Sequence, residues 1–240
     1  MKKAFILDKM TKKTGEKTMT LESSKNLGGI GAILMFIGLI PIPGAQPYLG
    51  IIALVGLILV LVALHGFANY YKESGIFNNS LYGVVAGIVG IVTAGVVAVY
   101  LFFYTSIVTD FLHKIYPGWN GNWSTLPGLT PTISNITTSD VLPILGSILS
   151  VLVILWIFAI IIAFFVRRSL KTLSAKASVG LFSTAALLLL IGAFLSIVLI
   201  GFLLMWIAAL LIAIAFFQIK PQPEQPAATM APPPPAPTPV

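Results

Sequence analysis

Side chains that could take part in catalysis are few in this sequence and lie far apart. It contains no cysteine, two histidines and seven acidic residues in 240 positions. The absence of cysteine excludes disulfides, thiolate metal ligands and a cysteine nucleophile. Between the long apolar segments, Asp110, His113 and Asp140 are the candidates for an active site, and one histidine with two isolated acids supports one only weakly. We therefore predict no catalytic residues, no metal site and no cofactor.

The apolar segments themselves contain no acidic or basic side chain in their middle. Coupled transporters need such groups there, because a proton or ion must be exchanged within the membrane. His65 comes nearest, at the end of the second apolar segment, and an interfacial histidine without a function is the plainer interpretation. The sequence also lacks the Ser/His pair, the paired aspartates and the HExxH motif of intramembrane enzymes. We therefore predict that the protein is not an enzyme.

The composition is that of a membrane protein. Hydrophobic residues make up 58% and charged residues 9% of the chain, whereas charged residues average about 25% in soluble proteins. The net charge of +7 could indicate a nucleic-acid partner. However, all Lys and Arg residues except Lys114 lie in segments that we place on one side of a membrane. The expected partner is the lipid bilayer, and no nucleic acid.

The predicted fold is an all-α integral membrane protein with six transmembrane helices. Residues 179–219 carry no charge, and as one helix they would be about 60 Å long at ~1.5 Å per residue. A bilayer core is about 30 Å thick. We therefore divide this run into two spans with a reversal near Ile200 and Gly201. The six spans cover about residues 21–40, 49–66, 81–105, 141–166, 181–197 and 202–218.

The cations predict the orientation of these spans through the positive-inside rule. The clearest cytoplasmic signal is the group of four between the fourth and fifth spans: Arg167, Arg168, Lys171 and Lys176. With six crossings, both termini lie in the cytoplasm and the loop 106–140 lies outside. We expect the plasma membrane of the cell as the location.

Two segments flank the transmembrane domain (residues 21–219). Residues 1–20 form a basic arm, interpreted as a disordered tail, as a segment at an anionic lipid surface, or as sequence upstream of a true start at Met19. Thr20 could cap the first helix, with Glu22 favourable against its dipole. Residues 220–240 contain nine prolines, which is typical of a solvated tail or of a docking segment for a cytoplasmic protein.

The first and last pairs of spans resemble each other. Residues 32–38 and 186–192 both read Ala, four apolar residues, Ile and Gly. In each copy a reversal follows, then a glycine (Gly50 and Gly201) and an apolar run that ends in aromatic residues. This pattern indicates a repeated hairpin, formed by spans 1–2 and 5–6, with both copies entering from the same side.

Small residues recur along one face of the third span, at spacings of four, three and four: Gly83, Gly87, Gly90 and Ala94. Such a face lets another helix backbone approach closely. The neighbour is either a helix of the same chain or the same helix of a second copy, which would make a homo-oligomer through span 3.

The external loop combines three features. Residues 107–115 have an apolar stripe opposite Asp110, His113 and Lys114, which indicates a short amphipathic helix. The segment 117–123 reads as tight turns with exposed aromatic residues. Asn122 and Asn135 begin glycosylation sequons.

Several motifs resemble an archaeal membrane protein family, domain of unknown function 996. They are Leu21–Ala32, Gly66–Lys72, Ile76–Gly83, Arg167–Leu170 and Val179–Ala185, together with the Pro-rich tail. The resemblance covers nearly everything from Leu21 onward. It implies an archaeal cell-membrane protein and brings no activity. Our functional hypothesis is a non-enzymatic scaffold or membrane-organising component. The alternative is a small channel or facilitator for an uncharged solute.

Overall fold

The computed structural model describes residues 20–40, 42–103, 105–134 and 136–220, and all regular elements in these ranges are helical. The all-α prediction is confirmed. The α-helices are α2 (Leu21–Gly38), α3 (Gln46–Tyr70), α4 (Ser74–Phe103), α5 (Ile107–Ile115), α6 (Thr138–Ala177), α7 (Leu181–Leu195) and α8 (Ile200–Gln218). Two 3-10 segments, η1 (Trp123–Gly128) and η2 (Ser196–Val198), lie in the connections.

Five helical segments are long and apolar enough to cross a membrane: Pro47–Tyr70, Ser74–Phe103, Thr138–Ala177, Leu181–Val198 and Ile200–Gln218. The prediction was six. Helix α2, the first predicted span, is less apolar than these five segments, because Glu22, Lys25 and several small polar residues occupy its first turns.

The helix ends show which local signals were interpreted correctly. Thr20 caps α2, with its hydroxyl oxygen accepting a bond of 3.2 Å from the Ser23 amide, as predicted. The sequence also offers Asn78, Asn79 and Ser80 as a cap for the third span, which it predicts from residue 81. This prediction is wrong, since these residues lie inside α4. Lys72 adopts a left-handed conformation (φ 53°) that reverses the chain within three residues, so α4 starts at Ser74.

The start of α6 is also earlier than predicted. Thr137 is the cap residue, and Asp140 is the third helical residue of a capping box, with its Oδ2 atom accepting a 3.0 Å bond from the Thr137 amide. The helix then continues for 40 residues to Ala177. At ~1.5 Å per residue this is about 60 Å, twice a bilayer core of about 30 Å, so α6 is too long to lie wholly within a bilayer core.

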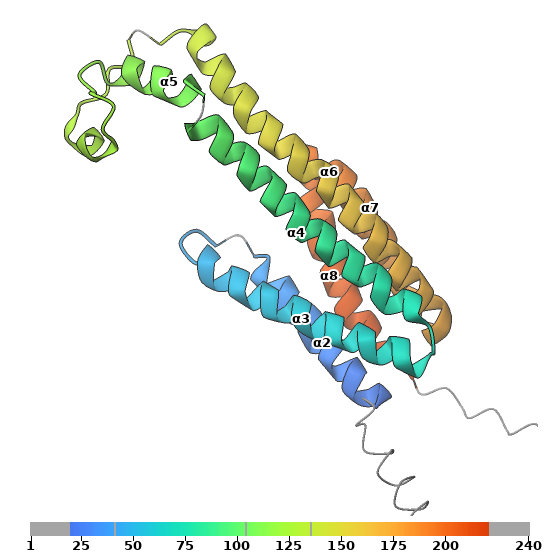
Figure 1. The fold of residues 1–240 in the computed structure, drawn as a ribbon. Helices are drawn as coiled ribbons and strands as arrows, with labels where there is room; N and C mark the ends of the chain where they lie inside the picture. The colour runs from blue at the N-terminus through green and yellow to red at the C-terminus, as the bar shows by residue number, and fades with distance from the viewer. Residues whose placement is uncertain (1–19, 41, 104, 135, 221–240) are drawn as a thin grey trace, which may run out of the picture.

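The six long helices form a closed ring of contacts (Figure 1). Each contacts the next along the chain, in the order α2, α3, α4, α6, α7 and α8, and α8 also contacts α2. The α3–α4 and α6–α7 connections meet the start of α2 and the end of α8 at one end of the ring, at the lower right of Figure 1. We call this the packed end. The opposite end, with the α2–α3 and α7–α8 connections and residues 105–137, is the loop end.

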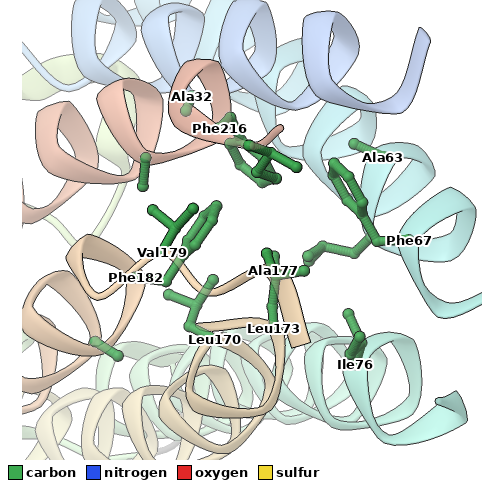
Figure 2. Close-up of a cluster of buried hydrophobic side chains, with 14 of the residues drawn as sticks. Ala32, Ala63, Phe67, Ile76, Leu170, Leu173, Ala177, Val179, Phe182 and Phe216 are labelled. Atoms are coloured by element: carbon green, nitrogen blue, oxygen red, sulfur yellow. The ribbon is translucent and has the colours of Figure 1, made fainter. Parts of the chain in front are cut away.

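The hydrophobic core lies at the packed end (Figure 2). Its largest members are Phe67 of α3, Phe182 of α7 and Phe216 of α8, all fully buried. The Phe216 ring stacks on Phe67 with centroids 5.8 Å apart and meets Phe182 edge-on at 5.0 Å. Gly28 of α2 admits this ring, since a Cβ there would lie 2.7 Å from Phe216. Four helices therefore meet at a single aromatic side chain.

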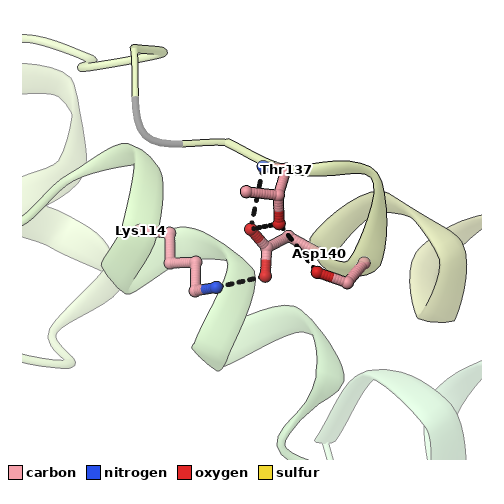
Figure 3. A network of polar contacts seen from close by, with 4 residues as sticks. Lys114, Thr137 and Asp140 are labelled. Carbon is pink, nitrogen blue, oxygen red and sulfur yellow. Dashed lines mark hydrogen bonds and ion pairs between the residues drawn. The ribbon is translucent and has the colours of Figure 1, made fainter.

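The loop end is held together differently. Apolar side chains of α4 and α6 are exposed along most of both helices. Lys114 of α5 forms an ion pair with Asp140 of α6, next to the Thr137 cap (Figure 3). The aromatic residues of this loop were predicted to be exposed, which is correct for Trp123 but not for Trp119. The Trp119 ring is buried, and its centroid lies 5.1 Å from that of the Trp123 ring. The indole of Trp119 donates to the Asn122 carbonyl at 2.7 Å.

Two tryptophans join helices at the positions where α2 and α7 end. The last carbonyl groups of a helix lack intrahelical partners, and lipid cannot supply one. Trp206 of α8 donates its Nε1–H to Phe36 O in the last turn of α2, at 3.0 Å. Trp156 of α6 donates to Phe194 O in the last turn of α7, at 3.1 Å. Each indole therefore satisfies a helix C-terminus that ends among apolar residues.

The α2–α3 hairpin and the α7–α8 hairpin have the same kind of contact between a glycine and the backbone of the second helix. A Cβ on Gly38 would lie 2.7 Å from Leu49 O and 2.5 Å from Ala53 N. A Cβ on Gly192 would lie 2.9 Å from Gly201 O and 3.1 Å from Met205 N. In both cases the glycine faces a carbonyl and the amide four residues later on the second helix.

This shared contact refines the predicted pairing of the two copies. The counterpart of Gly201 is Leu49, and not Gly50, which has nothing within 4 Å of a built Cβ. The second reversal lies at η2 and Leu199, which has a left-handed φ of 66°, slightly before the predicted position.

Candidate functional site

Charge gathers at the packed end. Of the eight Lys and Arg residues in the described ranges, only Lys114 belongs to the loop end. The other seven flank the packed end: Lys25, Lys72, Arg167, Arg168, Lys171, Lys176 and Lys220. Because the cations of the described ranges concentrate here, this end is the candidate functional site.

The four cations that we used to predict topology have different surroundings. Lys176 forms an ion pair of 3.5 Å with Glu73, which lies between α3 and α4. The Arg168 guanidinium lies over the Phe164 ring, 5.3 Å from its centroid, a cation–π contact. Arg167 and Lys171 form no ion pair with any residue of the described ranges. They line a pocket instead.

This α6–α7 pocket has a volume of about 230 Å³ and a mixed lining. Arg167 and Lys171 lie one helical turn apart on α6, and Ser183 and Thr184 come from the first turn of α7. Its apolar wall is formed by Ala186 and Leu187. Two cations, two hydroxyls and a helix N-terminus all favour an anion.

Residues 178–180 bring the two sides of this pocket together. Ser178 ends α6 in a left-handed conformation (φ 54°). The Val179 amide then donates to Ser174 O at 3.2 Å, and the Ser174 hydroxyl donates to Val179 O at 2.9 Å. The chain therefore turns back along α6, and α7 starts beside Arg167 and Lys171.

A second pocket, of about 410 Å³, lies between α3 and α4. Its polar lining is His65, Asn69, Lys72, Ser74 and Asn78. One ring nitrogen of the histidine, Nε2, is 3.2 Å from the amide nitrogen of Asn69, and its ring meets Phe77 edge-on at 4.8 Å. The sequence singled out His65, but as an interfacial residue and not as part of a pocket.

A buried polar contact fixes α4 against α6 beside these pockets. The Ser80 hydroxyl donates to the Ser169 hydroxyl at 2.8 Å, and Ser169 donates to Ile76 O. Both serines are buried. The contact fixes the position of α6, and with it Arg167 and Lys171, relative to the start of α4.

Comparison with known proteins identifies the family. Residues 52–210, about two thirds of the chain, match the model of a family described as a protein of unknown function (DUF996). The chain belongs to this family. It is also 25% identical over 201 residues to an uncharacterised protein of Methanocaldococcus jannaschii, covering 84% of this chain and 94% of that protein. No solved structure matches the chain.

The motifs on which the DUF996 resemblance rested come together at the packed end. Phe67 and Phe182 belong to its core, and Lys72, Arg167 and Ser183 line its two pockets. The motifs are far apart in the sequence, so only the fold shows that they share one region.

The small-residue face of α4 packs inside the chain. A Cβ on Gly90 would lie 2.6 Å from Phe158, on Gly87 3.4 Å from Ile162, and on Gly83 3.3 Å from Val166, all on α6. Ala94 is buried. Of the two interpretations left open by the sequence, this contact corresponds to packing within the monomer.

The described polar residues of the loop that the sequence predicts to be external do not form a common site. Asp140 pairs with Lys114, and His113 is 2.8 Å from Thr109 O through Nδ1. Across the described residues, no group of three His, Asp or Glu side chains could hold a metal ion. Asn122 accepts two bonds from Ser124 through its side-chain oxygen, at 3.1 and 2.8 Å. Asn135 lies outside the described residues.

Proposed function

We propose that this DUF996 protein crosses the membrane six times, with α2 as the sixth crossing. Helix α2 has 18 residues, about 27 Å at ~1.5 Å per residue. It packs against α3, and their hairpin repeats the glycine contact of the α7–α8 hairpin, in which both helices are long and apolar enough to span. A helix that packs antiparallel against a spanning helix, and is joined to it by a short turn, crosses the membrane in the opposite direction. We therefore place α2 across the membrane beside α3.

The orientation follows from the distribution of charge. Seven of the eight described cations flank the packed end, and the positive-inside rule places that end in the cytoplasm. The protein then lies in the plasma membrane of an archaeal-type cell. Both of its termini are in the cytoplasm, and residues 105–137 are outside. This single observation carries the proposed topology.

The role that fits this arrangement is a non-enzymatic scaffold or membrane-organising component. The supporting observation is a second stripe on α4, opposite the glycine face. It is formed by exposed valines at spacings of four, three, four and three: Val85, Val89, Val92, Val96 and Val99. A 3.5-residue repeat of β-branched residues is the pattern of a helix–helix seam. A homo-oligomer through span 3 would use this face, because α6 covers the other one.

Disulfide crosslinking between copies tests this seam, since the chain has no native cysteine. Single cysteines at Val89, Val92 and Val96 should give crosslinked dimers in native membranes. The matched control is Ile91→Cys, because Ile91 is as exposed as Val92 (69% against 59%). It points about 120° away from the stripe at ~100° per residue. Equal crosslinking at Ile91 and Val92, or a strictly monomeric protein, would contradict the scaffold.

The cytoplasmic tail after Lys220 would offer the scaffold a docking segment for a second protein. A channel or facilitator for an uncharged solute is the competing function. Each of the two pockets lies between adjacent helices at the packed end, so neither supports a path through the bundle. Solute flux into proteoliposomes above that of empty vesicles would favour the channel.

A further inference from the structure

Arg167 and Lys171 are the feature of the packed end that the scaffold does not use. They are two cations one turn apart, without an acidic partner in the described ranges, facing the first turn of α7. We propose that the α6–α7 pocket binds the phosphate-bearing headgroup of an anionic membrane lipid. Basic pockets between transmembrane helices on the cytoplasmic side bind such headgroups.

The polar lining matches the chemistry of a phosphate group. Arginine offers a planar fork of N–H donors that suits two phosphate oxygens, and lysine adds a compact charge. The Ser183 hydroxyl forms no hydrogen bond with other described residues, so it is available as a donor. The N-terminus of α7, which starts at Leu181, adds the positive end of a helix dipole.

The apolar side of the pocket distinguishes a lipid from a soluble phosphate. Leu187 lines the pocket, and Ile191 and Phe194 continue the same face of α7 toward the loop end, at spacings of four and three. All three are exposed, so an acyl chain attached to the bound headgroup can lie along them. A free phosphate would leave this face unused.

The α3–α4 pocket is a weaker candidate for the same ligand. It is larger, and Lys72 is the one cation among its lining residues. The α6–α7 pocket is the one in which paired cations and an apolar track meet.

The experiment is native mass spectrometry of the full chain in detergent, titrated with phosphatidylglycerol or with phosphatidylcholine. The wild type should retain phosphatidylglycerol at least tenfold more tightly than phosphatidylcholine. Arg167→Gln with Lys171→Gln should weaken phosphatidylglycerol at least tenfold, which corresponds to about 1.4 kcal/mol. The matched control is Arg168→Gln with Lys220→Gln, which removes the same charges at the same end and should stay within about twofold of the wild type.

Further arms identify the part of the lipid that is recognised. Leu187→Ala should weaken phosphatidylglycerol without changing the weak binding of inorganic phosphate. If the double glutamine variant does not fold, Ser183→Ala and Arg167→Lys replace it, with smaller losses expected for both. Equal retention of the two lipids, equal losses in the pocket and control variants, or competition by inorganic phosphate as strong as that by lipid would each overturn the proposal.

This inference rests on the proposed placement of the helices in a membrane, with the packed end in the cytoplasm, but its test depends neither on that orientation nor on self-association. Lipid binding in detergent does not depend on which face is cytoplasmic. Failure of the lipid titration is therefore distinguishable from failure of the topology or of the α4 seam.

Discussion

The packed end and the loop end of this bundle are built from equally apolar helices, yet only one of them has a core. At the packed end, Phe67, Phe182 and Phe216 are buried among four helices. At the loop end, α4 and α6 leave large apolar side chains exposed. Helix α5, which belongs to this end, has few contacts with α4 and α6. The same helices are therefore tightly packed at one end and accessible to lipid at the other.

This difference follows from the solvent. In a membrane, lipid tails are as apolar as leucine, so burying an apolar side chain between helices gains little hydrophobic free energy. Close packing and satisfied backbone groups hold the helices instead, and the glycine contacts, the two indole bonds and the Ser80–Ser169 bond supply these. Stability should therefore depend on a small number of positions, which lie at both ends of the bundle.

The largest expected effect contrasts two phenylalanines of α8. Phe216 is 0% exposed and Phe202 is 58% exposed. Phe216→Ala should lower the free energy of unfolding by about 3 kcal/mol or more, the cost of a buried cavity. Phe202→Ala should change it by less than about 1 kcal/mol. Unfolding in mixed detergent micelles measures both, and similar losses at the two sites would remove the distinction between the ends.

A second contrast concerns the glycines of the two hairpins. Gly38→Ala and Gly192→Ala place a methyl group against the backbone of the next helix, so each should destabilise the protein by about 1–3 kcal/mol through overpacking. A Cβ added at Gly50 or Gly146 would have no neighbouring atom within 4 Å. Gly50→Ala and Gly146→Ala should therefore stabilise the protein by up to about 1 kcal/mol, through the higher helix propensity of alanine. A stable Gly38→Ala variant would argue against the shared hairpin contact.

A smaller effect is expected at the tryptophans. Trp206→Phe keeps an aromatic ring beside Phe36, which now stacks on the indole at 4.4 Å, but removes the bond to Phe36 O. The loss should be about 1 kcal/mol, the typical net value of one hydrogen bond. Trp156→Phe should behave alike, since its indole has the same role at α7. An unchanged unfolding midpoint for both would show that these helix ends have other partners.

The sequence predicted the helical segments because their apolar runs are long and are interrupted by proline, glycine or charge. It also predicted Thr20 as a cap, since a threonine directly before the first helical residue can accept a bond from an amide of the first turn. It failed at residues 78–80, where asparagine and serine suit a cap as well as a helix interior that forms side-chain bonds. Asn79 forms such a bond to Gly75 O at 2.7 Å.

The pockets could not be predicted from the sequence. The α6–α7 pocket depends on how residues 178–180 fold back along α6. This geometry is set by the left-handed conformation of Ser178, which no local sequence pattern predicts. The spacing of Arg167 and Lys171 was visible, but it indicated topology equally well. Likewise, the glycine face of α4 predicts a close neighbour, and only the fold shows that α6 is that neighbour.

The central claim is that the packed end faces the cytoplasm of a six-times-spanning protein. Single cysteines in this cysteine-free chain test it, with Ala175→Cys at the packed end and Thr130→Cys at the loop end, both exposed. A membrane-impermeant maleimide applied to intact cells should label Thr130→Cys and should reach Ala175→Cys only after the cells are opened. Labelling of Ala175→Cys in intact cells, at the rate seen for Thr130→Cys, would contradict the account.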